Sequence, residues 1–192
     1  MGAIGCRGGG DGKRAISSPA RAGVRACTGF ARHVSRSRSD GDDLFHEALL
    51  RAHAKLDTLR DETAFKPWLY QIVISVHRNR LRRAFWRRFL PLPDQVSADE
   101  PAASGNYRVS EWSPDAAEAA RRAREALLTL PAAQREAIVL YEIEGWQVDE
   151  IAALQRCSAS AVKSRLARGR DRLRAYYEAR HAAVPKLTGE TP

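Results

Sequence analysis

Apolar residues recur at intervals of three and four along most of this chain, which is the periodicity of an amphipathic helix. A first helix is predicted from residue 21 to about residue 35, and a second from residue 43 to residue 56. The side chains expected to face inward from these two helices are Val24, Cys27, Phe30, Ala31, Val34, Leu44, Phe45, Ala48, Leu49, Ala52 and Leu56. Between them, the segment 39–42 is predicted to end the first helix and to cap the second.

A third, long helix is predicted after a polar loop at residues 57–63. Pro67 falls near the start of this helix, where the missing N–H leaves no hydrogen bond unmade. The helix is expected to continue to about residue 89 and to bury a stripe made of Leu69, Ile72, Val73 and Val76.

Helical periodicity returns in the second half of the chain. A helix is predicted over residues 115–128, and another opens at Pro131. Their expected inward-facing residues are Ala119, Ala123, Leu127, Leu128, Ala137, Ile138, Leu140 and Tyr141. Since no stretch alternates apolar and polar residues over the length of a strand, the fold class is predicted to be all-α.

The segment 91–114 divides the chain, with four prolines, small polar residues and acids. We therefore expect two small helical domains, at 21–90 and 115–180, joined by a flexible linker. The ends, 1–20 and 181–192, are predicted to be disordered tails.

Residues 148–174 read as two short helices around a tight turn. Asp149 and Glu150 suit the positive end of the first helix, and Ser158 or Ser160 can cap the second. The second helix keeps Val162, Leu166 and Leu173 for the core and carries the cations Lys163, Arg165, Arg168, Arg170, Arg172 and Arg174. A helix-turn-helix with a basic second helix fits the major groove of duplex DNA. The alternative is an ordinary helix whose arginines cover a solvated face.

Charge points to a polyanionic partner as well. The net charge is +9 and the sequence pI is about 10.0. Residues 64–90 hold seven cations and no acid. Trp68, Ser75, Asn79 and Arg82 lie off the apolar stripe of this segment, a mixture of ring, polar group and cation that suits unstacked nucleic acid. Trp68 could equally be a core residue.

Other classes of function receive no support from the composition. Three cysteines without paired spacing and five scattered histidines favour neither a disulfide scaffold nor a metal site. We find no nucleophile–base spacing or phosphate loop, so no enzyme and no cofactor is expected. No run approaches the roughly 20 apolar residues of a membrane span, and a cytoplasmic location is expected.

Two stretches resemble a known family. DDLFHEALLRAHAKLDTLRDETAFKPWLYQIVISVHRNRLRR is similar to the second conserved region of bacterial RNA polymerase sigma factors of the extracytoplasmic-function (ECF) group. ALLTLPAAQREAIVLYEIEGWQVDEIAALQRCSASAVKSRLARGRDRLR is similar to their fourth region. The two occur in the family's order with a linker between them, and the pair is more specific than either motif alone.

The resemblance implies three sets of contact residues. Core RNA polymerase would be bound by Asp43, Leu44, His46, Glu47 and Leu50. The minus-ten promoter element would be bound by Thr63, Lys66, Trp68, Arg78, Asn79, Arg82 and Arg83. The minus-thirty-five element would be read by Ser158, Ser160, Ala161, Lys163, Ser164, Arg165 and Arg168, the start of the helix facing base edges and the arginines mostly phosphates.

The sequence departs from the family pattern at a few positions. His46 replaces a usual Gln, Asp61 a common Gly, and Arg156 stands first in a turn that is typically Gly-apolar-Pro. The implied partners are core RNA polymerase and promoter DNA, with an anti-sigma factor as a further candidate and no membrane. The alternative function is a helix-turn-helix regulator that binds an operator without polymerase; it has no need of the block at 43–83.

Overall fold

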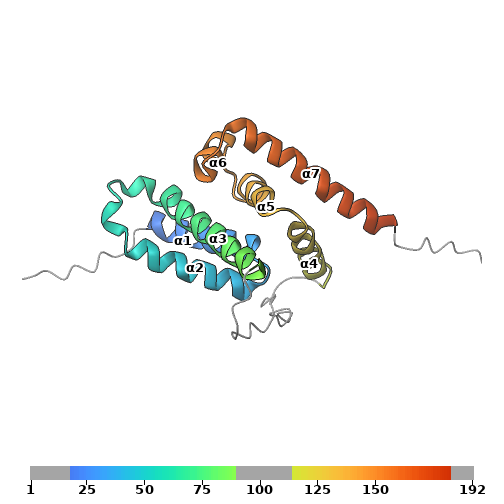
Figure 1. Cartoon of the computed structure of the whole chain (residues 1–192), viewed down its shortest axis with the longest axis horizontal. Coiled ribbons are helices and arrows are strands. Elements are labelled where there is room, and N and C mark those ends of the chain that lie inside the picture. The colour runs from blue at the N-terminus through green and yellow to red at the C-terminus, as the bar shows by residue number, and fades with distance from the viewer. Residues whose placement is uncertain (1–17, 90–113, 183–192) are drawn as a thin grey trace, which may run out of the picture.

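The computed structural model describes residues 18–89 and 114–182, and within them the elements are helical (Figure 1). The all-α prediction is confirmed. The first unit contains α1 (Ser18–Val34), α2 (Arg38–His53), the 3₁₀ turns η1 (Leu56–Thr58) and η2 (Glu62–Ala64), and α3 (Phe65–Phe89). The second contains α4 (Pro114–Leu128), α5 (Ala132–Ile138), the π-helical turn η3 (Val139–Ile143), α6 (Val148–Gln155) and α7 (Ala159–Ala182). Most of the predicted tails and nearly all of the predicted linker lie outside the described residues. Residues 18–20 and 181–182, predicted as tail, are instead helical and belong to α1 and α7.

The first unit is a three-helix bundle in which each helix contacts the other two. Most of the predicted stripe residues are buried there. Val24 is partly buried, and two residues, Leu49 and Leu56, are 36% and 51% exposed because they lie on the outer side of α2 and in η1. On α3, Ile72 is only partly buried, while Tyr70 and Ile74 join the core.

The second helix begins earlier than its apolar pattern predicts. Ser37, rather than the segment 39–42, is its N-cap, and Ser37 and Asp40 form a reciprocal capping box. Gly41 therefore lies inside α2, where a Cβ atom would come within 2.6 Å of the Arg32 Cα atom. The glycine permits the close crossing of α1 and α2, so the predicted helix break at 39–42 is wrong.

The second unit packs α5 and α6 against α7. Val162 and Leu166 of α7 are buried and Leu173 is partly buried, as predicted. The predicted stripe on α4 is wrong in part, since Ala119 and Ala123 are exposed and Ala126, which was not predicted, is buried. Leu127 is buried as predicted, and Leu128 is partly buried. The reason is that α4 buries mainly its C-terminal end, against α1 and α7.

The two units also pack on each other, which the sequence did not indicate. α3 contacts α6, and α1 contacts α4, α5 and η3. Their buried apolar side chains belong to one continuous cluster. Figure 1 shows α5 and α6 lying between α3 and α7, so α7 is on the side of the second unit that faces away from the first.

Candidate nucleic-acid interface

The helix-turn-helix predicted at residues 148–174 is formed by α6 and α7. Glu150 caps the start of α6 by accepting a hydrogen bond from the Gln147 backbone N–H at 2.8 Å. α6 ends at Gln155, and the next residue, Arg156, is its C-cap, with a φ of 51° in the left-handed region. Ser158 then caps α7, because its Oγ accepts from the Ala161 N–H at 3.2 Å. A three-residue connection, 156–158, thus sets the angle between the two helices.

The start of α7 presents a polar surface to solvent. Ser158, Ser160, Lys163 and Arg168 are exposed, while Ala161, Ser164 and Arg165 are partly buried. Arg165 is partly engaged in the turn itself, since its Nη1 contacts the Gln155 Oε1 at 2.5 Å and the Cys157 Sγ at 3.0 Å. Ser158 is the N-cap of α7, and the other six predicted recognition residues lie on its first three turns. The buried Val162 and Leu166 pack the opposite side of the helix against the core.

A second basic surface begins at the N-terminal end of α3. Thr63 and Lys66 are exposed, and Trp68 is partly buried, with its ring 6.0 Å from that of Phe65. Trp68 thus contributes to the core and still keeps part of its surface at the solvent. Asp61 accepts hydrogen bonds from the backbone N–H and the hydroxyl of Thr63. These bonds lower the pKa of Asp61 and keep a negative charge on this loop.

Further along α3, the residues predicted to contact DNA differ in solvent exposure and in the hydrogen bonds they already make. Arg82 and Arg83 are exposed, and Arg82 donates to the side-chain oxygen of Asn79. Arg78, in contrast, is hydrogen-bonded to the second unit. Its Nη2 lies 2.7 Å from a Glu136 carboxylate oxygen, and its Nη1 donates to the Gln155 backbone oxygen at 3.0 Å. All seven residues predicted for this surface are therefore exposed or partly exposed. Two of them contact the second unit: Arg78 through Glu136 and Gln155, and Lys66 through the Trp146 ring, whose centre lies 4.7 Å from its Nζ.

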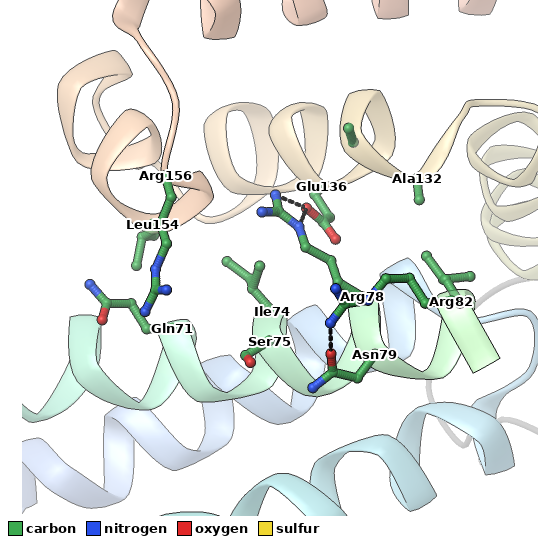
Figure 2. Close-up of a pocket in the computed structure, with 12 residues that line it drawn as sticks. Gln71, Ile74, Ser75, Arg78, Asn79, Arg82, Ala132, Glu136, Leu154 and Arg156 are labelled. Atoms are coloured by element: carbon green, nitrogen blue, oxygen red, sulfur yellow. Dashed lines mark hydrogen bonds and ion pairs between the residues drawn. The ribbon is translucent and has the colours of Figure 1, made fainter.

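Glu136 is the unexpected residue of this region. It is fully buried, and its carboxylate meets His77 at 2.9 Å, Arg78, and the Gln155 amide at 3.3 Å. Burial opposes ionisation, but the hydrogen bond from His77 and the charge of Arg78 outweigh it and hold the pKa of Glu136 below its ordinary value. Glu136 and Arg78 line one cleft of about 460 Å³ between α3 and α5–α6, together with Gln71, Ser75, Asn79 and Arg156 (Figure 2).

The outer face of α2 forms a separate surface. Asp43, His46 and Leu50 are exposed, and Leu50 keeps 62% of its side-chain surface at the solvent. Glu47 accepts from Arg80 of α3 at 2.7 Å and from Arg51 at 2.6 Å. Burial raises the pKa of Glu47 and the two arginines lower it, with a net shift below its ordinary value.

Leu44 does not belong to that outer surface. Its side chain is only 1% exposed and packs in the core of the first unit. A leucine at this position of α2 holds the helix against its neighbours, so a direct contact with a partner protein would need the helix to move.

The contacts between the units could hardly be found from the sequence. His77 lies on α3 one residue after Val76, and Glu136 immediately precedes the apolar Ala137 and Ile138. The sequence does place these two titratable residues next to buried apolar ones, which indicates that each needs a polar partner inside the protein, because an unpaired buried charge is costly. Nothing in the spacing says that the partner is 59 residues away.

No helix among the described residues is long and apolar enough to cross a membrane. In the same parts of the chain, His, Cys, Asp and Glu side chains form no group of three or more that could hold a metal ion.

Together, an exposed polar helix-turn-helix and a second basic helix within an all-α chain are features of the class of DNA-binding proteins. Comparison with known families agrees. Residues 21–87 match the family model for sigma-70 region 2, and residues 120–173 match that for sigma-70 region 4. The chain belongs to the ECF RNA polymerase sigma factors, a family of transcription initiation factors.

Several relatives are similar over most of the chain. ECF RNA polymerase sigma factor SigM of Mycobacterium tuberculosis is 34% identical over 144 residues, which are 75% of this chain and 67% of the relative. ECF RNA polymerase sigma factor EcfG of Rhodopseudomonas palustris is 31% identical over 158 residues, 80% of each chain. Among solved structures, the sigma factor RpoE of Bartonella quintana, in complex with the anti-sigma factor NepR, aligns with a TM-score of 0.62 at 26% identity, covering 83% of this chain and 94% of that one.

Proposed function

We propose that this chain directs core RNA polymerase to promoters by means of three surfaces with separate tasks. In this proposal, residues 21–90 act as the region 2 domain, which docks on polymerase and binds the minus-ten element, and residues 115–180 act as the region 4 domain, which reads the minus-thirty-five element. The chain performs no bond chemistry. Its binding energy favours the opened promoter over the closed duplex, because the exposed ring surface of Trp68 on α3 can stack on a base only once the strands separate.

The polymerase surface in this proposal is the outer face of α2. Asp43, His46, Glu47 and Leu50 combine charge with an exposed apolar side chain, a mixture that is common at protein interfaces. Leu44 supports this face from inside the bundle.

The minus-ten surface consists of the N-terminal end and exposed side of α3. Thr63, Lys66 and Trp68 would receive an unstacked base, since Trp68 retains exposed ring surface beside a cation. Asn79, Arg82 and Arg83 would hold the neighbouring phosphates, and Arg78 would join them once it leaves Glu136.

The minus-thirty-five surface is the start of α7. Ser158, Ser160 and Ala161 lie at the N-terminal end, where a recognition helix approaches base edges most closely. Lys163 and Ser164 would reach bases or phosphates, and Arg165 and Arg168 phosphates. The observation that carries the proposal is that this polar helix surface and the basic surface of α3 fall within the two matched sigma-70 regions.

A partner that restrains the chain is also part of the proposal. The Bartonella quintana sigma factor was solved with an anti-sigma factor bound. Because this chain shares that fold and the same two regions, we propose an anti-sigma factor as its regulator, in the cytoplasm.

The decisive experiment is run-off transcription with purified core polymerase and fragments of the source genome. We expect discrete transcripts that depend on the added chain. Trp68→Ala and Lys163→Ala should each reduce them, while Arg122→Ala, an exposed arginine of α4 outside all three surfaces, should not. If specific operator binding without polymerase is found and no transcript appears, the chain acts as an independent regulator and the proposal is wrong.

A further inference from the structure

The cleft between α3 and α5–α6 carries more positive charge than its own carboxylate can balance. Its volume is about 460 Å³, and among the described residues that line it are Arg78, Arg82 and Arg156 but a single acid, Glu136 (Figure 2). Glu136 is fully buried and already accepts from His77 and Arg78. Three arginines against one glutamate leave a surplus of two positive charges in the lining.

The hydrogen-bond acceptors in and beside the cleft are occupied by donors of the chain itself. The Gln155 backbone oxygen accepts from Arg78 at 3.0 Å, and the side-chain oxygen of Asn79 accepts from the Nη2 of Arg82. Donors, in contrast, are left over. Within residues 18–89 and 114–182, the Arg156 guanidinium has no hydrogen-bond or ion-pair partner. A molecule that enters the cleft must therefore bring acceptors, and negative charge on them would match the surplus of arginine.

Arg156 reaches the cleft from an unfavourable backbone conformation. Its φ of 51° lies in the left-handed region, which glycine adopts freely and a residue with a Cβ atom adopts at a cost. Figure 2 shows its side chain extending from the end of α6 toward Gln71 of α3, and both residues are exposed. Strained residues cluster at ligand sites, where the position of the side chain is worth the strain. A strained arginine whose guanidinium has no partner in the described chain therefore indicates a ligand.

The remaining wall of the cleft is largely apolar. Ile74 of α3 and Leu154 of α6 line it together with Ala132 and Ala133 of α5. Its volume lies in the range of small-molecule sites, which typically combine apolar walls with a few convergent polar groups. A lone phosphate would meet the arginines and leave the apolar wall uncovered. The lining thus matches a molecule in which phosphate is joined to a ring.

We propose that this cleft is a binding site for a nucleotide. The phosphates accept from Arg156 and from the Gln71 amide, because a guanidinium binds phosphate oxygens through two parallel N–H groups. The base lies against Ile74 and Leu154. Since the site exists only in the folded chain, bound nucleotide raises the thermal midpoint as its concentration increases. The proposal goes beyond the promoter role, and it is tested without polymerase and without promoter DNA.

The test is isothermal titration calorimetry of the full chain with the four ribonucleoside diphosphates. At least one of them should bind wild type in a saturable manner and raise its thermal midpoint. Two further probes divide the nucleotide into its parts. Adenosine or guanosine, which has the ring and no phosphate, and inorganic pyrophosphate, which has the phosphates and no ring, should each bind at least about tenfold more weakly than that nucleotide.

Two variants locate the site on residues outside the three proposed binding surfaces. Arg156→Gly removes the guanidinium and relieves the backbone strain, so it should lower nucleotide affinity about tenfold or more in a chain that is at least as stable as wild type. Gln71→Leu removes the facing amide at a similar size and should weaken binding by less. The matched control is Arg172→Ala, which removes the same charge from an exposed position of α7 outside the cleft. Circular dichroism and thermal melting without nucleotide establish that each variant is folded.

The nucleotide site stands if affinity falls in Arg156→Gly and Gln71→Leu and is unchanged in Arg172→Ala. Equal losses in Arg156→Gly and Arg172→Ala would mean that the nucleotide responds only to the positive charge of the chain, which overturns the site. Binding that survives both cleft variants, or no saturable binding by any of the four nucleotides, overturns it as well. If pyrophosphate binds as tightly as the nucleotides, the cleft recognises phosphate alone and the nucleotide assignment is wrong. Run-off transcription decides none of these outcomes, so the site and the promoter role can fail separately.

Discussion

Arg80 of α3 holds Glu47 of α2, with its Nε atom 2.7 Å from the carboxylate, and the second oxygen of Glu47 accepts from Arg51 at 2.6 Å. The proposed polymerase surface is therefore fixed by ion pairs within the first unit. Glu47→Arg should weaken binding to core polymerase at least about tenfold, roughly 1.4 kcal/mol, because it reverses a charge at the centre of the surface. Affinity is measured by competition for fluorescently labelled core enzyme.

The control for this variant is Glu118→Arg. Glu118 is an ion-paired acid of α4, bound to Arg121, and lies outside the surface. Loss of the Glu47 pairs should cost stability of no more than about 1 kcal/mol each, since they are partly solvated. If Glu47→Arg and Glu118→Arg are both folded and bind polymerase with equal affinity, the outer face of α2 is not the polymerase-binding surface.

Lys163→Ala tests the start of α7 as the reader of the minus-thirty-five element. The exposed ammonium stands one turn after the Ser158 cap, so its loss should cost about 1–3 kcal/mol on the matching promoter if it contacts a base. Arg172→Ala removes the same charge from a later, exposed turn of α7 and should cost less. The readout is holoenzyme binding to matched and scrambled elements. An equal, sequence-independent loss in both variants would mean that Lys163 contacts phosphate only.

Gly41→Ala tests the crossing of α1 and α2. A Cβ at Gly41 would lie 2.6 Å from the Cα and 2.9 Å from the backbone nitrogen of Arg32, and backbone atoms cannot rotate away. Overpacking of this kind typically costs about 1–3 kcal/mol, which exceeds the roughly 1 kcal/mol that alanine gains over glycine in a helix. The matched control is Gly23→Ala in α1, where the added Cβ would meet the Phe65 ring at 3.5 Å, an ordinary contact.

Urea unfolding followed by circular dichroism gives both values. Gly41→Ala should lower the midpoint, and Gly23→Ala should raise the free energy of unfolding by about 0.5–1 kcal/mol. A stabilising Gly41→Ala would mean that the two helices separate at little cost.

Arg156→Gly tests strain in the helix-turn-helix. Arg156 adopts a φ of 51°, a conformation that favours glycine, at the position where the family typically has Gly. Relief of that strain should stabilise the chain by about 0.5–1 kcal/mol, measured as a shift of the thermal midpoint. Arg172→Gly, at an exposed position inside α7, should have the opposite effect, because glycine weakens a helix interior.

Local patterns predicted the helices far better than their assembly. The stripe of α7 was predicted from spacing alone, since Val162 and Leu166 must share one face of any helix. The start of α2 was missed because Gly41 reads as a helix breaker unless the backbone of Arg32 is known to lie against it. The exposed face of α4 was missed because the packing of only one end of a helix leaves no trace in its periodicity.

The same distinction applies to the candidate surfaces: groupings within one helix could be predicted from the sequence, and contacts between the two units could not. Residues on one helix, such as Ser158 and Lys163, could be grouped from sequence because helical spacing places them together. The pairing of Arg78 with Glu136 could not, because it depends on how two units with separate sequence patterns come together. Family resemblance assigned Arg78 to DNA, and only the structure shows that an internal carboxylate holds it.

The buried carboxylate of Glu136 also predicts an acid-sensitive fold. Burial opposes its charge, but His77 and Arg78 reverse that effect, so its pKa in the folded chain lies below the ordinary value of 4.5. A group whose pKa is lowered on folding adds stability above its unfolded pKa, and this contribution is lost as the pH falls through the lower, folded value. Between about pH 7 and 5 the contribution should be constant, and below about 4.5 wild type should lose stability more steeply than Glu136→Gln, which carries no proton to bind. Urea midpoints measured from pH 7 to pH 3 check this, with Glu118→Gln as a control for an exposed acid whose pKa is also lowered by an arginine. Parallel curves for wild type and Glu136→Gln would mean that Glu136 takes up its proton at the same pH whether the chain is folded or not, and hence that His77 and Arg78 do not hold its charge.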